Sequence, residues 1–62
     1  MKIYWANAKT EDLELLSTYE GCTDIHQAER QFGVWEEYGY RIREKWIAVY
    51  EDGKEISRVT IF

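Results

Sequence analysis

The sequence predicts a small α+β domain in which one main helix packs against an antiparallel sheet. Three observations favour this class. An Asp-Gly pair at 52–53 separates two segments rich in strand-forming residues, which is the pattern of a β-hairpin. Apolar residues with helical spacing occupy 24–38. A further strand-forming segment begins the chain. We expect the element order β-α-α-β-β, with β-β-α-β-β as the alternative.

Length and composition predict a single folded unit spanning 1–62. The chain has 62 residues, of which 45% are hydrophobic and 16% aromatic, and its net charge is only −4. Disordered chains combine few apolar and aromatic residues with a large net charge, so this chain should fold. A domain of this size has one small core. We therefore expect a free energy of unfolding of about 3–5 kcal/mol unless the chain oligomerises.

The first third of the chain predicts a strand and then a segment with two interpretations. Residues 2–8 are rich in strand-forming side chains such as Tyr4 and Trp5. Over 10–20, Thr10 can cap a helix that Gly21 would end, and we take helix as the prediction and a second strand as the alternative. The residues on one side of the helix would be Leu13, Leu15, Leu16 and Tyr19, and those that alternate as in a strand are Leu13, Leu15, Ser17 and Tyr19.

The main helix is predicted over 24–38. Asp24 and Gln27 have the spacing of a capping box, and Gly39 suits the left-handed residue that follows a helix. Gly33 costs about 1 kcal/mol inside a helix and marks either a kink or the helix end. The apolar stripe keeps its phase across Gly33, which favours one continuous helix. The stripe consists of Ile25, Ala28, Phe32, Trp35 and Tyr38.

The C-terminal hairpin is predicted over about 40–51 and 55–62, with its turn at Asp52-Gly53. The run 46–50 is apolar on both faces, so this strand is either central or has one face covered by a partner. A homodimer joined through this run is one way to cover it. Loops of two and of three residues pair different side chains across the hairpin, so the register stays open.

The sequence predicts no catalytic, metal or cofactor site. Cys22 and His26 are the only soft-ligand pair, whereas a structural zinc site needs four such ligands. A lone cysteine forms no disulfide within the chain, and a reactive Cys22 near a helix start is the minor alternative. The glycines are isolated, so no phosphate-binding loop is evident. We therefore expect a protein that is not an enzyme.

The chain is also expected to be complete, soluble and cytoplasmic, with no membrane partner. Its start carries Lys2 and no apolar run of signal-peptide length. No segment approaches the roughly 18 apolar residues of a membrane span.

Charge is unevenly distributed along the chain. Residues 1–39 contain three basic and eight acidic residues, a balance of −5, whereas residues 40–62 contain five basic and four acidic residues, a balance of +1. An acidic surface can steer a small domain onto a basic partner, and exposed aromatic residues can anchor it there. The expected partner-binding residues are Glu11, Asp12, Glu14, Glu29, Glu36 and Glu37, with Trp35, Tyr38 and Tyr40 as aromatic anchors.

An alternative site uses Arg41, Arg43 and Lys45 to bind nucleic acid. These three residues alternate and so share one face of a strand. Proteins that bind single strands combine such basic tracks with aromatic side chains on which bases stack. Here the aromatic residues Trp46 and Tyr50 fall on the other face of the strand. The basic residues can instead pair with acids on a neighbouring strand.

In size, acidity, aromatic content and lack of catalytic motifs, the chain resembles the short α+β proteins of phages and mobile elements, which include anti-CRISPR proteins. The resemblance covers the general character of the whole chain and assigns no functional residue. It implies an inhibitor that blocks a basic, nucleic-acid-handling partner. The expected function is thus a non-catalytic protein-binding module, and the alternative is a small RNA-binding or single-stranded-DNA-binding protein.

Overall fold

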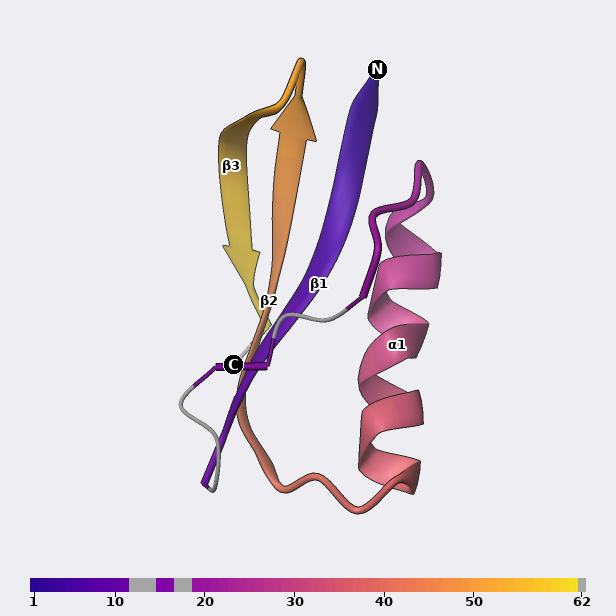
Figure 1. The fold of residues 1–62 in the computed structure, drawn as a ribbon, viewed down its shortest axis with the longest axis vertical. Coiled ribbons are helices and arrows are strands. Elements are labelled where there is room, and N and C mark those ends of the chain that lie inside the picture. The colour runs from indigo at the N-terminus through magenta and orange to yellow at the C-terminus, as the bar shows by residue number, and fades with distance from the viewer. Residues whose placement is uncertain (12–14, 17–18, 62) are drawn as a thin grey trace.

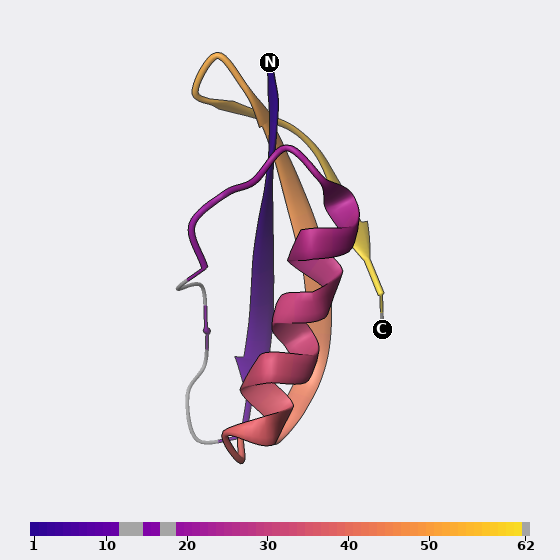
Figure 2. The same ribbon diagram turned by 90° about the vertical axis from the view of Figure 1, so that its right-hand side faces the viewer.

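The computed structural model has the element order β-α-β-β and describes residues 1–11, 15–16 and 19–61. The three strands form one antiparallel sheet in the order β1-β2-β3, and the helix lies against one face of it (Figures 1 and 2). The predicted α+β class is confirmed, whereas the second helix of the predicted order is not shown. The elements are β1 (Lys2–Thr10), α1 (Ile25–Glu37), β2 (Ile42–Glu51) and β3 (Lys54–Thr60).

The segment predicted as a first helix has a different role in its described residues. Thr10, the expected cap, is the buried last residue of β1. Leu16 forms an antiparallel bridge with Ala8, and Cys22 forms another with Tyr4. Both bridges lie on the edge of β1 that β2 leaves open, so Leu16 and Cys22 run along that edge. For these described residues, backbone bonding to the strand and burial of Leu16 outweigh the helical pattern.

Gly21 lies where this segment approaches the side chains of Ile3 and Trp5. A Cβ built at Gly21 would collide with Ile3 Cγ2 and would lie 2.9 Å from two atoms of the Trp5 indole. The sequence pattern favours Gly21 as the end of a helix. Its place in the structure shows another reason for glycine, because any side chain here would displace these two residues.

Helix α1 confirms the predicted main helix within one residue at each end. Asp24 is its N-cap and accepts a hydrogen bond from the His26 backbone N–H at 2.9 Å. Gly33 lies inside the continuous helix and does not end it. Gly39, with φ of 92°, takes the left-handed conformation expected after the C-cap residue Tyr38.

The core lies between α1 and the strands β1 and β2. Three alanines, Ala6, Ala8 and Ala28, are almost completely buried where the helix crosses the sheet. Their small side chains let the two layers approach closely, and larger residues fill the space around them. The rest of the core is Leu16, Phe32, Trp35 and Ile47.

The hairpin settles the register that the sequence left open. Asp52 (φ 52°) and Gly53 (φ 77°) form a two-residue turn between the paired residues Glu51 and Lys54. Farther along, Val49 pairs with Ser57 while Tyr50 pairs with Glu55, so Ile56 is the extra residue of a β-bulge. β2 is the central strand, as predicted.

Residues 46–49 are buried within a single chain. These four residues are therefore covered within the chain, whereas Tyr50 at the end of the run is only half-buried. In the described part of the chain, no helix has the length and apolarity needed to cross a membrane.

Candidate functional site: an acidic helix face and an exposed tyrosine

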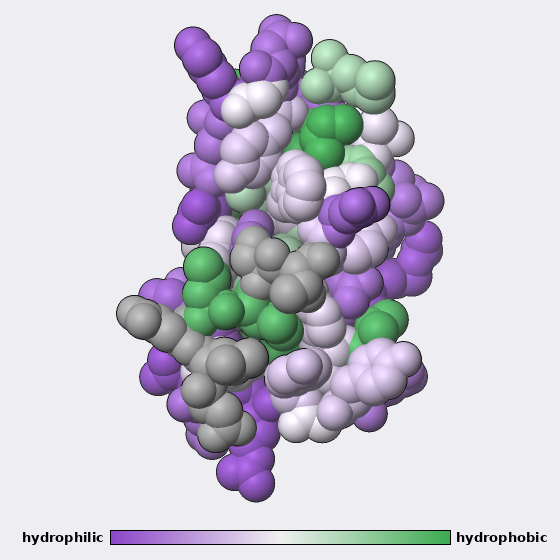
Figure 3. All heavy atoms as spheres, in the orientation of Figure 1, coloured by the Kyte–Doolittle hydropathy of each residue, from purple (hydrophilic) through white to green (hydrophobic). Residues whose placement is uncertain are grey.

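The outer face of α1 carries most of the acidic residues singled out from the sequence. Because Ala28, Phe32 and Trp35 face the sheet, helical spacing turns Glu29 and Glu37 toward solvent, and both are exposed. Glu36 lies on the flank of the helix and accepts a hydrogen bond from Lys45 Nζ. In the view of Figure 3, hydrophilic residues cover most of the margin and hydrophobic residues form separate patches.

Tyr38 is the exposed aromatic residue at the end of this face. The backbone N–H of Tyr38 donates to the carbonyls of Val34 and Trp35, both at 3.1 Å, so its position is fixed by the last helical turn. Its side chain nevertheless stays in solvent, and 78% of the residue is exposed. Tyr40 is held in a similar way through its N–H bond to Trp35 and is also exposed. A fixed backbone with a solvent-exposed ring is a favourable anchor for a partner.

The expectation of Trp35 as an exposed anchor is wrong. Trp35 is 5% exposed and packs against Phe32 with ring centroids 5.8 Å apart. The physical reason is helical phase, since Ala28, Phe32 and Trp35 lie on one face and that face covers the sheet.

Of the remaining acidic residues of the expected surface, the structure describes Glu11 alone. Glu11 is exposed and forms an ion pair with Arg41 at 3.5 Å. The end of β1, the end of α1 and the start of β2 lie at the same end of the molecule, the lower end in Figure 1. Glu11 and Glu37 are therefore both near this end, whereas Glu29 lies farther up the helix. Asp12 and Glu14 lie outside the described residues.

The basic residues of the alternative site do not form one open track. Arg41 precedes β2 and pairs with Glu11. Lys45 pairs with Glu36, its side chain is only 17% exposed, and its Nζ lies 5.7 Å from the centre of the Phe32 ring. Arg43 is exposed. The acids that pair with two of the three cations come from the helix and from the end of β1, not from a neighbouring position in the sheet.

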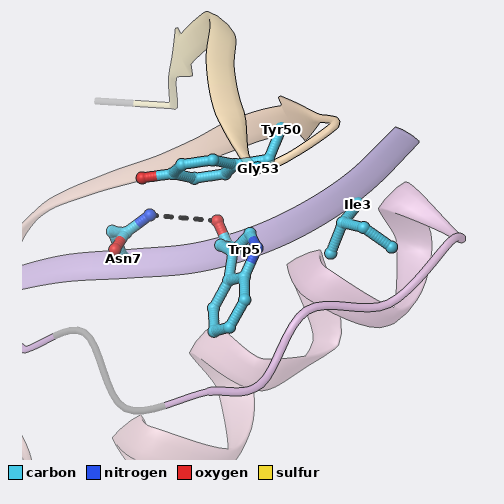
Figure 4. A pocket seen from close by; sticks show the side chains of 5 residues that line it. All are labelled: Ile3, Trp5, Asn7, Tyr50 and Gly53. Carbon is cyan, nitrogen blue, oxygen red and sulfur yellow. Dashed lines mark hydrogen bonds between the residues drawn. The ribbon is translucent and has the colours of Figure 1, made fainter. Parts of the chain in front are cut away.

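An aromatic hollow on the opposite face of the sheet was not singled out from the sequence. Its volume is about 470 Å³, and Trp5 and Tyr50 meet edge to face there with centroids 6.1 Å apart (Figure 4). Asn7 Nδ2 donates to the Trp5 carbonyl at 3.1 Å. The alternation of Ile3, Trp5 and Asn7 indicates that these residues share one face of a strand. The approach of Tyr50 depends on the pairing register of β1 and β2. The lining residues are Ile3, Trp5, Asn7, Tyr50 and Gly53.

Trp46 lies on the same face, beside β3. It is buried, and the Arg58 guanidinium lies 5.3 Å from the centre of its ring. Arg58 also pairs with Glu55 at 2.7 Å. Nε1 of Trp46 has no hydrogen-bond partner among the described residues. These contacts hold Arg58 against the sheet and pair its charge with that of Glu55.

Cys22 and Tyr19 meet near the start of α1. The Cys22 thiol donates to the Asp24 carbonyl, with a distance of 3.0 Å between sulfur and oxygen. Partial burial raises the pKa of the Tyr19 hydroxyl, the neighbouring Cys22 raises it further, and the positive charge of Arg30 opposes both. His26 is exposed. Across 1–11, 15–16 and 19–61, no three His, Cys, Asp or Glu residues are grouped so that they could hold a metal ion.

The described surfaces offer charge and aromatic area for contact with another molecule. Comparison of the chain with protein-family models, with curated proteins and with solved structures gave no match.

Proposed function

We propose that this protein is a non-catalytic protein-binding module that docks on a basic partner through the outer face of α1. The observation that carries the proposal is Tyr38, which is 78% exposed directly after the acidic pair Glu36 and Glu37. Tyrosine is among the residues that contribute most to binding at protein interfaces. An exposed ring on a rigid helix end loses little conformational freedom when it is buried by a partner.

Charge supports the choice of a basic partner. Helix α1 contains three glutamates and one arginine, and the whole chain has a net charge of −4. Glu29 and Glu37 are exposed and have no ion-pair partner among the described residues, so their charge is available to a partner. Such a surface increases the rate of association with a basic protein and disfavours acidic ones.

The kind of partner follows from the same chemistry. A protein that handles nucleic acid has a basic groove, and an acidic domain that occupies this groove inhibits the protein by occlusion. An inhibitor of the anti-CRISPR type, acting in the cytoplasm of a host cell, is the form of this function that the resemblance of the sequence favours. Direct binding of nucleic acid is supported less well, because Arg41 and Lys45 are already paired with acids.

A crosslinking experiment tests the proposal. A photoreactive phenylalanine analogue replaces Tyr38 in cells of the source organism, and the crosslinked proteins are identified by mass spectrometry. We expect a basic protein whose adduct is lost when Glu37→Lys is added to the chain.

The matched control is Glu20→Lys, which changes the net charge by the same amount at an exposed position away from α1. We expect the adduct to survive this change. Equal adduct yields from the Glu37→Lys and Glu20→Lys chains would show that α1 is not the docking face, and adducts with acidic proteins alone would contradict a basic partner.

A further inference from the structure

Strand β3 differs from the other strands because all seven of its residues are exposed. It is an edge strand, and α1 contacts β1 and β2 but not β3. Val59 and Ile61 lie on the α1 side of the sheet, because Val59 pairs with the core residue Ile47 and Ile61 lies beside Lys45. Both are about half exposed. β3 thus combines an open edge with uncovered aliphatic side chains.

The register shows which backbone groups of β3 are open. The Ile61 N–H donates to the Lys45 carbonyl at 2.7 Å, so Ile61 turns its hydrogen-bonding groups toward β2. In an antiparallel ladder, residues alternate between those bonded to the neighbouring strand and those turned away from it. Val59 therefore also bonds to β2, whereas Arg58 and Thr60 turn their N–H and C=O groups outward. Such groups are a template for another strand.

We propose that a second copy of this chain pairs antiparallel with β3 and that the twofold axis passes between the two Val59 residues. Arg58 of each copy then lies opposite Thr60 of the other, and four hydrogen bonds form between these outward groups. Val59 packs against Val59, and Ser57 lies opposite Ile61. The two three-stranded sheets become one six-stranded sheet with both helices on the same face.

Charge and strand length select this register. Only outward-turned residues can bond across the axis, so the pairs must come from Arg58 and Thr60. Placing Arg58 opposite Arg58 sets like charges against each other, which destabilises a strand pair. Placing Thr60 opposite Thr60 centres the pairing on the last residue of β3, so little of the strand is paired. The Arg58–Thr60 register has neither defect and brings the two Val59 side chains together.

The charged residues next to this contact do not oppose it. Arg58 is held over Trp46 and is paired with Glu55 of its own chain, so pairing of the strands buries no unpaired charge. The bulge at Ile56 interrupts the ladder beyond Ser57 and so limits the paired stretch.

Three properties of the chain favour a second copy as the occupant of this edge. A twofold interface needs a self-complementary surface, which the Arg58–Thr60 register provides. The opposite edge of the sheet already bonds to Leu16 and Cys22, so the assembly closes at two copies. A chain of 62 residues also has a small core, and oligomerisation is a common way to stabilise such a domain.

Sedimentation equilibrium of the full chain tests the pairing. We expect a mass of twice the 7.5 kDa chain, and a mass of one chain for Val59→Arg, which places two positive charges at the axis. Val34→Arg is the matched control, because Val34 is an exposed valine on α1 and its replacement should leave the dimer intact. A wild-type protein that stays monomeric at millimolar concentration overturns the proposal.

Thr60→Pro tests the hydrogen bonds themselves. Its lost N–H points away from β2, so the hairpin keeps its ladder and the circular dichroism spectrum should match the wild type while the dimer is lost. A dimer that survives both Val59→Arg and Thr60→Pro uses another surface, and this outcome overturns the proposal. If Thr60→Pro does not fold, the mass of the Val59→Arg variant tests the proposal alone. Glu37→Lys should leave the dimer unchanged, which separates this test from that of the helix face.

Discussion

Strands β1 and β3 flank the same central strand, yet their environments are opposite. β1 contains four buried residues, whereas β3 contains none. β1 has α1 over one face and the bridges of Leu16 and Cys22 along its outer edge. β3 has neither. Both strands are rich in residues that favour strands, so strand propensity does not explain the difference. What covers a strand decides how much it contributes to stability.

The side chains match these environments. β1 presents Ala6 and Ala8 to the helix, and their small size lets Ala28 and the larger core residues approach. β3 presents the branched residues Val59 and Ile61 at a place that the helix does not reach. Their exposure leaves both side chains available for contact with a second molecule.

The largest expected effect is a difference in stability between a substitution in the core and one on β3. Ile47 and Val59 are cross-strand partners, but Ile47 is 1% exposed and Val59 is 50% exposed. Ile47→Ala should lower the free energy of unfolding by about 2–5 kcal/mol. Val59→Ala should lower it by about 0.5 kcal/mol or less in dilute monomer. Urea unfolding measures both changes. Equal losses would show that a residue of β3 contributes as much to stability as its buried partner in β2.

The next effect tests the covered edge of β1. Gly21→Ala should destabilise the protein by about 1–3 kcal/mol, because the new methyl group meets Ile3 and Trp5. Gly33→Ala is the control, since no atom lies within 4 Å of a Cβ at this helical position. That change should stabilise the protein by about 0.5–1 kcal/mol. Thermal unfolding reports both, and a neutral Gly21→Ala would mean that the segment does not press on β1.

A smaller effect concerns the helix that covers β1. Asp24→Ala removes the acceptor for the His26 N–H and should cost about 1 kcal/mol in unfolding experiments. The exposed neighbour Thr23 provides a control, because Thr23→Ala should change stability by about 0.5 kcal/mol or less. If the two variants unfold at the same urea concentration, the cap does not hold α1 in place.

The smallest effect is a pH dependence near the same edge. The pKa of Tyr19 is raised from 10.0 in the folded chain. The Tyr19 hydroxyl therefore loses its proton at a higher pH in the folded state than in the unfolded state. Stability from this group is complete below pH 10 and falls as the pH rises from there to the folded pKa. Tyr19→Phe should make the loss of stability above pH 10 shallower in urea unfolding. An unchanged slope would exclude Tyr19 as its source.

Local signals account for the parts of the fold that the sequence predicted well. Asp24 and Gly39 delimit α1, and Asp52-Gly53 forms the hairpin turn because its backbone conformation suits these residues. The segment 10–20 could not be assigned in this way, because its apolar residues satisfy both helical and strand periods. Bonding of Leu16 to the edge of β1 is a long-range contact that no local pattern contains.

The candidate site was predictable in part. Trp35 belonged to the apolar stripe, so its burial follows from the same periodicity that predicted the helix. Tyr38 also fitted that stripe, but the helix ends at Glu37 and the ring is free of the core. The pairing of Lys45 with Glu36 requires the packing of α1 on β2, which sequence spacing does not reveal.

The extra residue at Ile56 has a consequence for how the protein behaves at high concentration. Because Val49 pairs with Ser57 and Tyr50 with Glu55, deletion of Ile56 would leave a regular ladder from Lys54 to Thr60. A long, flat and regular edge is what cross-β fibrils extend. The bulge shortens that edge and twists it, so the exposed strand supports one contact of defined length and is a poor seed for fibril growth. A single extra residue thus removes the regularity that fibril growth requires.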